Sequence, residues 1–77
     1  MISIMDKIKE NIGLRIKDLR SKAKISQEEL ALRANLDRTY INSVENGRRN
    51  ISIVNIEKIA LALNSSIKAF FNSERFN

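Results

Sequence analysis

Apolar and polar residues alternate along the chain with the period of an α-helix, in which one face recurs every three or four residues. The first such pattern predicts a helix at about residues 6–23, with lysines and arginines on its other faces. Its apolar positions are Ile8, Ile12, Ile16, Leu19 and Ala23. Gly13 interrupts this helix at a cost in helix propensity, so we expect it to serve close packing against another helix.

Capping signals define two short helices in the middle of the chain. Ser26 and Glu29 have the spacing of a capping box, which predicts a helix that starts at Ser26 and ends near Arg33. Asp37 is a favourable N-cap for the next helix. That helix ends at Gly47, because glycine readily forms a left-handed C-terminal cap.

The connection between these two helices is only residues 34–36, which is typical of a helix-turn-helix. Asn35 lies where the turn needs left-handed backbone, and asparagine tolerates that conformation. Small and apolar residues are expected where the helices cross: Leu30, Ala31, Ala34, Ile41 and Val44. If Ile41 points inward, a helical period of 100° per residue places four polar residues on the outer face. They are Thr39, Asn42, Ser43 and Asn46.

Two further helices are predicted towards the C-terminus. Ser52 caps a helix with a single apolar stripe, which residues 64–66 interrupt. The stripe consists of Ile56, Ile59, Ala60 and Leu63. A short fifth helix follows, with Ile67, Phe70 and Phe71 on one face, and we expect residues 73–77 to fray. The predicted fold is all-α, with one domain of five helices over residues 1–77.

The composition excludes several classes of function. The 77 residues include no cysteine and no histidine, which removes disulfide frameworks, zinc knuckles and catalytic sites built on these residues. The carboxylates are scattered along helices and no nucleophile lies near a base in a known motif, so we expect no enzymatic activity. We also expect no metal, cofactor or small-molecule ligand.

Charge and hydropathy narrow the choice of partner. The net charge is +5, from 14 basic and 9 acidic residues, which is a moderate bias towards polyanions. The apolar runs are too short to span a bilayer, and the start of the chain lacks the pattern of a signal peptide. Together with the polar outer face of the helix-turn-helix, these features predict a cytoplasmic protein that binds double-stranded DNA and no membrane.

The segment SQEELALRANLDRTYINSVENG, residues 26–47, resembles the helix-turn-helix of the lambda-repressor and Cro family. The run LDRTYINSVENGRRNIS, residues 36–52, is similar to the controller proteins of restriction–modification systems within that family. The resemblance covers about residues 12–72. It implies a five-helix lambda-repressor-like domain, with the helix-turn-helix at the second and third helices, that binds an operator as a homodimer.

The resemblance also implies roles for particular residues. Four positions of the recognition helix would read bases: Arg38, Thr39, Tyr40 and Ser43. For Tyr40, packing against the following loop is an equal alternative. Four positions would bind phosphates: Gln27, Asn46, Arg48 and Arg49. Glu28 would contact RNA polymerase, and Arg20 would form a buried ion pair with Glu45. The family often has glycine where this chain has Lys24, which leaves the end of the first helix open.

The fifth helix is too short to bury its apolar face alone, so Ile67, Phe70 and Phe71 are expected to form a dimer interface. The resemblance implies a controller protein that activates transcription at low concentration and represses it at higher concentration, on a palindromic operator. The alternative is a repressor of phage, plasmid or antitoxin type with the same fold. A protein-interaction module that has lost DNA binding is disfavoured by the polar outer face beside Arg48 and Arg49.

Overall fold

The computed structural model describes the backbone of residues 4–77 and the side chains of residues 7–77. Its helices are α1 (Ile4–Ala23), α2 (Gln27–Ala34), α3 (Arg38–Glu45), α4 (Ile53–Ala62) and α5 (Ile67–Phe71). A single turn of 3₁₀ helix, η1 (Glu74–Phe76), follows. The predicted five-helix, all-α fold is confirmed over this part of the chain. No helix there is both long and apolar enough to cross a membrane.

Four of the helices start at a residue whose side chain accepts a hydrogen bond from the backbone of the first turn. These N-cap residues are Ser26, Asp37, Ser52 and Ser66. The first three were predicted. At Ser26, the hydroxyl accepts from the backbone nitrogen of Glu29 at 3.0 Å, while the carboxylate of Glu29 accepts from Arg33 Nε at 2.9 Å. Only the serine half of the predicted capping box is therefore present among the described hydrogen bonds.

The first four helices are each followed by one residue in the left-handed region. These residues and their φ angles are Lys24 (58°), Asn35 (55°), Gly47 (71°) and Asn64 (57°). In each case this residue and the next donate backbone hydrogen bonds to carbonyls of the last helical turn, which is a Schellman motif. The predictions for Asn35 and Gly47 are confirmed. Lys24 keeps the left-handed turn although it is not glycine.

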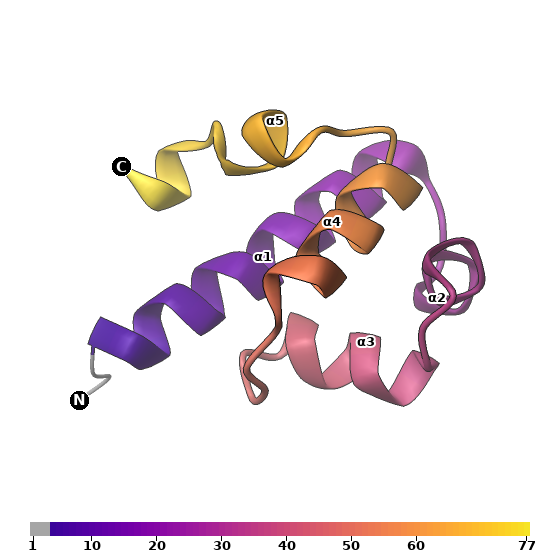
Figure 1. Cartoon of the computed structure of the whole chain (residues 1–77), viewed down its shortest axis with the longest axis horizontal. Helices are drawn as coiled ribbons and strands as arrows, with labels where there is room; N and C mark the ends of the chain where they lie inside the picture. Colours follow the sequence, from indigo (N-terminus) through magenta and orange to yellow (C-terminus); the bar gives the residue numbers. More distant parts are fainter. Residues whose placement is uncertain (1–3) are drawn as a thin grey trace.

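Helix α1 crosses the end of α3 at Gly13. A Cβ atom on Gly13 would lie 2.5 Å from the carbonyl oxygen of Val44 and 2.6 Å from that of Glu45. Both neighbours are backbone atoms of α3, so a side chain could fit only if the two helices moved apart. The predicted packing role of Gly13 is confirmed, and this contact fixes how α3 lies against α1 (Figure 1).

The core lies between the five helices. Its buried apolar residues are Ile12, Ile16, Leu30, Ala31, Ala34, Ile41, Val44, Ile56, Ile59, Ala60, Leu63 and Phe70. All five residues predicted at the crossing of α2 and α3 are buried, and so is the whole predicted stripe of α4. In α1 only the middle of the stripe is buried, because Ile8 and Ala23 at its two ends are exposed.

The C-terminal segment is ordered, so the prediction that residues 73–77 fray is wrong. Phe76 lies in edge contact with Phe71, with ring centroids 5.0 Å apart. Arg75 Nε donates to Asp18 Oδ2 at 2.8 Å and ties η1 to α1. The prediction rested on the general tendency of chain ends to fray, whereas one aromatic residue and one ion pair hold this segment in place.

Phe70 is the second correction in this region. Its side chain is fully buried in the single chain, so it has no surface to offer a partner. Arg15 of α1 reinforces this arrangement, because its Nε donates to the carbonyl oxygen of Phe70 at 2.8 Å. The predicted interface residues Ile67 and Phe71 are half-buried. The prediction overlooked that η1 and α1 together supply the cover that α5 lacks by itself.

Candidate nucleic-acid interface

The first turn of α3 presents polar side chains to solvent. Arg38 and Thr39 are exposed, as is the Asp37 cap whose Oδ1 accepts from Thr39 N at 2.7 Å. Ser43, one turn further on, is partly exposed. The predicted base-reading residues Arg38 and Thr39 are therefore free of the core and can reach a partner molecule.

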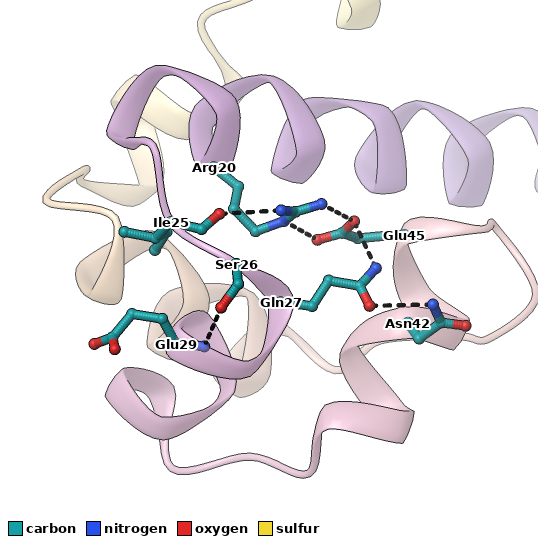
Figure 2. Close-up of polar contacts among 7 residues, drawn as sticks. All are labelled: Arg20, Ile25, Ser26, Gln27, Glu29, Asn42 and Glu45. Carbon is teal, nitrogen blue, oxygen red and sulfur yellow. Dashed lines mark hydrogen bonds and ion pairs between the residues drawn. The ribbon is translucent and has the colours of Figure 1, made fainter.

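The last turn of α3 is anchored by an ion pair. The side chain of Glu45 is completely buried, and the side chain of Arg20 is 20% exposed. Arg20 Nε donates to Glu45 Oε2 at 2.9 Å and Nη2 donates to Oε1 at 3.0 Å, which is a bidentate pair (Figure 2). Arg20 Nη1 also donates to the carbonyl oxygen of Ile25 at 3.0 Å. The predicted pair is present.

The hydrogen bond to Glu45 raises the pKa of Arg20 above its ordinary value, although partial burial acts in the opposite direction. The guanidinium therefore remains charged wherever the protein is folded near neutral pH. The charged Arg20 side chain can therefore act as a permanent clamp between α1 and α3.

A chain of amide hydrogen bonds leads from the buried pair to the surface. Gln27 Nε2 donates to Glu45 Oε1 at 3.1 Å, and Gln27 Oε1 accepts from Asn42 Nδ2 at 3.1 Å (Figure 2). Asn42 Oδ1 in turn accepts from Asn46 Nδ2 at 3.2 Å. Two predicted phosphate ligands, Gln27 and Asn46, are thus joined through Asn42, for which no role was predicted. Its position on the outer face, one turn from Asn46, was the signal that could have found it.

Tyr40 lies in the first turn of α3, at the end opposite to the buried ion pair. Its ring is partly buried against the core, and the guanidinium carbon of Arg49 lies 5.1 Å from the ring centroid. Both residues border an open hollow of about 450 Å³. The full lining is Asp37, Thr39, Tyr40, Ser43 and Arg49. The structure thus brings three predicted base-reading residues and one predicted phosphate ligand together around one surface depression.

The packing of Tyr40 against the following loop, one of the two alternatives, is realised by its contact with Arg49. The hydroxyl of Tyr40 also accepts a hydrogen bond from Asn55 Nδ2 of α4 at 3.0 Å. No sequence signal identified Asn55, because the contact depends on how α4 lies against α3. Arg48 is exposed in the loop, and Glu28 is exposed on α2, away from the core.

Comparison with known proteins agrees with this geometry. The sequence model of the helix-turn-helix family matches residues 16–70. The control protein C.MunI from Mycoplasma sp is 45% identical over 69 residues, which cover 88% of this chain and 93% of C.MunI.

Two solved structures are similar in both fold and sequence. The restriction-modification controller protein C.AhdI from Aeromonas hydrophila is 43% identical, with a TM-score of 0.79 over 82% of this chain and 96% of that one. The controller protein C.Esp1396I, as a tetramer in complex with its natural 35 base-pair operator, is 36% identical. Its TM-score is 0.80, over 90% of this chain and 87% of that one.

Proposed function

The chain belongs to the helix-turn-helix family of DNA-binding regulators, and from this premise we propose that it is a cytoplasmic controller protein of a restriction–modification system. In this proposal it binds a palindromic operator as a homodimer. It activates transcription at low concentration and represses it when a second dimer binds. The relation to C.Esp1396I, which was solved as a tetramer on its operator, supports the binding of two dimers.

The observation that carries the proposal is the polarity of the outer face of α3. Arg38 and Thr39 are exposed at its N-terminal end, which is the end that enters the major groove first in this class of motif. The one carboxylate within α3, that of Glu45, is buried and paired, so it does not repel a polyanion. We assign base reading to Arg38, Thr39, Tyr40 and Ser43, as predicted.

Phosphate binding is assigned to the two sides of this face. Gln27 and Asn46 lie along the amide chain, and Arg48 and Arg49 lie in the loop after α3. Each phosphate that an arginine neutralises is expected to make the slope of log affinity against log salt more negative by about 0.9. Binding should therefore weaken steeply as salt rises.

We assign the dimer contact to α4 and α5. Ile67 and Phe71 keep part of their surface exposed, and Leu61 of α4 is 63% exposed. Sedimentation should show a dimer at micromolar concentration. Leu61→Glu should give a monomer because it places a charge in the apolar contact. Leu32→Glu on α2, at a leucine that is 73% exposed, should stay dimeric. A monomeric wild-type protein at this concentration would contradict the assignment of a dimer contact to α4 and α5.

The exposed carboxylate of Glu28 is the proposed polymerase contact. Glu28→Ala should then reduce transcription activation in a purified system without changing operator binding. A repressor of phage, plasmid or antitoxin type would show no activation at any concentration. Neighbouring methyltransferase and endonuclease genes would favour the controller function over that alternative.

The experiment that tests the proposal is selection of bound duplexes from a random DNA pool. We expect symmetric half-sites whose centres are roughly 34 Å apart, one helical turn of DNA. Recovery of sequences with no shared motif would contradict a sequence-specific regulator. Single half-sites without symmetry would contradict binding as a two-fold dimer.

A further inference from the structure

Asn55 is placed so that it can control the hydroxyl group of Tyr40. It is the third residue of α4, and its backbone nitrogen donates to the Ser52 cap at 3.1 Å, which fixes the start of the helix. From there its side chain crosses to α3, and Nδ2 donates to the Tyr40 hydroxyl at 3.0 Å. Asn55 itself is partly buried and is not among the residues that line the hollow.

The direction of this hydrogen bond matters for recognition. A tyrosine hydroxyl has one proton to donate and two lone pairs that accept. Since the asparagine amide is the donor, the hydroxyl oxygen is the acceptor and its own proton remains for another group. Tyr40 lines the hollow between α3 and the loop, where an acceptor atom of DNA would fit.

The same contact also positions an arginine. The ring of Tyr40 lies beneath the guanidinium of Arg49, at 5.1 Å, and Arg49 is exposed in the loop before α4. A ring that is held at its hydroxyl end by Asn55 offers the guanidinium a constant surface. One amide therefore supports two side chains of the proposed interface.

We propose that Asn55 is a positioning residue for DNA recognition: it orients the Tyr40 hydroxyl to donate its proton to a DNA oxygen or nitrogen, and it keeps the ring in place under Arg49. This rests on the proposed function, because it describes how the same surface reads its site. Asn55 makes no contact with DNA in this scheme and acts through Tyr40.

The test is a double-mutant cycle on the selected operator, with Asn55→Ala and Tyr40→Phe made singly and together. A net hydrogen bond corresponds to a change in affinity of about 2- to 12-fold, so Asn55→Ala should weaken operator binding within that range. In the Tyr40→Phe background the same exchange should cost nothing, because the hydroxyl that it orients is absent. Asn72→Ala, the same exchange at an exposed position after α5, is the control and should leave binding unchanged.

A second variant tests the direction of the bond. In Asn55→Asp the carboxylate can only accept, so it should capture the tyrosine proton and weaken operator binding more than Asn55→Ala does. The Tyr40→Phe background separates this effect from the added negative charge. Because aspartate has the size of asparagine, Asn55→Asp can replace Asn55→Ala in the double-mutant cycle if the alanine variant does not fold.

The free protein gives an independent measurement. Tyr40 is the single tyrosine and the chain has no tryptophan, so intrinsic fluorescence reports on this ring alone. Asn55→Ala should change the emission while Asn72→Ala does not. Equal costs of Asn55→Ala with and without the Tyr40 hydroxyl, or an unchanged emission, would overturn the role of Asn55. A wild-type protein that prefers no DNA sequence would instead overturn the proposed function, and this inference with it.

Discussion

The last turn of α3 is held by a buried charge, whereas its first turn rests on a partly buried ring. At the last turn, Glu45 is completely buried and accepts three hydrogen bonds from Arg20 and Gln27. At the first turn, Tyr40 accepts one neutral hydrogen bond and lies under the exposed guanidinium of Arg49. The two ends of one short helix are therefore supported by interactions of very different strength.

This difference indicates which part of the proposed interface is fixed by the fold and which part can move when DNA binds. Breaking a buried ion pair by removing one partner typically costs about 3–5 kcal/mol, so the last turn cannot shift without a large penalty. A cation–π contact at an exposed site contributes roughly 0.5–1 kcal/mol, so the loop that carries Arg49 can move at a much smaller cost. We infer that the position of α3 is set at its C-terminal end.

Arg20→Ala should have the largest effect on stability. It leaves the buried carboxylate of Glu45 without its ion-pair partner, which should lower the free energy of unfolding by about 3–5 kcal/mol. The matched control is Arg33→Ala, because Arg33 forms an exposed pair with Glu29 at the same 2.9 Å distance. That pair should contribute only about 0.3–0.5 kcal/mol. Urea unfolding of both variants measures the difference, and equal midpoints would show that burial does not distinguish the pairs.

Arg38→Ala should have the opposite profile, with little effect on stability and a clear effect on recognition. Arg38 is exposed, and its planar guanidinium can donate to two acceptors of guanine together. Its loss should remove about 1–3 kcal/mol of discrimination at one base pair per half-site, while binding to unrelated DNA stays nearly constant. Competition binding with single-base operator variants measures this.

Arg38→Lys is the control for Arg38, since it keeps the charge but loses the fork of donors. It should resemble the alanine variant in specificity and the wild type in salt dependence. If Arg38→Ala instead weakened binding to every sequence alike, Arg38 would be a phosphate ligand. Base reading would then be assigned to Thr39, Tyr40 and Ser43.

The same contrast between the two ends of α3 explains what could be predicted from the sequence. The helices, their caps and the crossing of α2 and α3 follow from local periodicity and from single residues such as Asp37 and Asn35. The buried pair of Arg20 and Glu45 was predicted through family resemblance, since neither residue alone indicates burial. All of these features follow from residues close in sequence or from the motif that this chain shares with the family.

The contacts that escaped prediction depend on how α4 and the C-terminal segment pack against the earlier helices. Asn55 reaches Tyr40 across the α3–α4 loop, and Arg75 reaches Asp18 from the other end of the sequence. Phe70 looked like an interface residue because α5 is short, but the segment after it returns to cover the ring. Periodicity describes which face of a helix is apolar, and it does not determine which segment packs against that face.

Lys24→Gly should have the smallest effect and should raise stability. Lys24 has φ of 58°, a region that costs a residue with a side chain roughly 1–2 kcal/mol. Glycine removes that cost but loses more conformational entropy on folding, by roughly 0.4–1 kcal/mol. The midpoints of these two ranges differ by about 0.8 kcal/mol, a net gain that should raise Tm by about 3–6 °C for a chain of this length. The turn also presents the Ile25 carbonyl oxygen to Arg20, so it contributes to the support of α3 at its last turn. Operator affinity should change little, since Lys24 is assigned no base or phosphate contact. Lys22→Gly is the control, because it places the same residue in the last helical turn of α1, where it should cost up to about 1 kcal/mol. If both variants lowered Tm, the left-handed turn at Lys24 would carry no strain that glycine relieves.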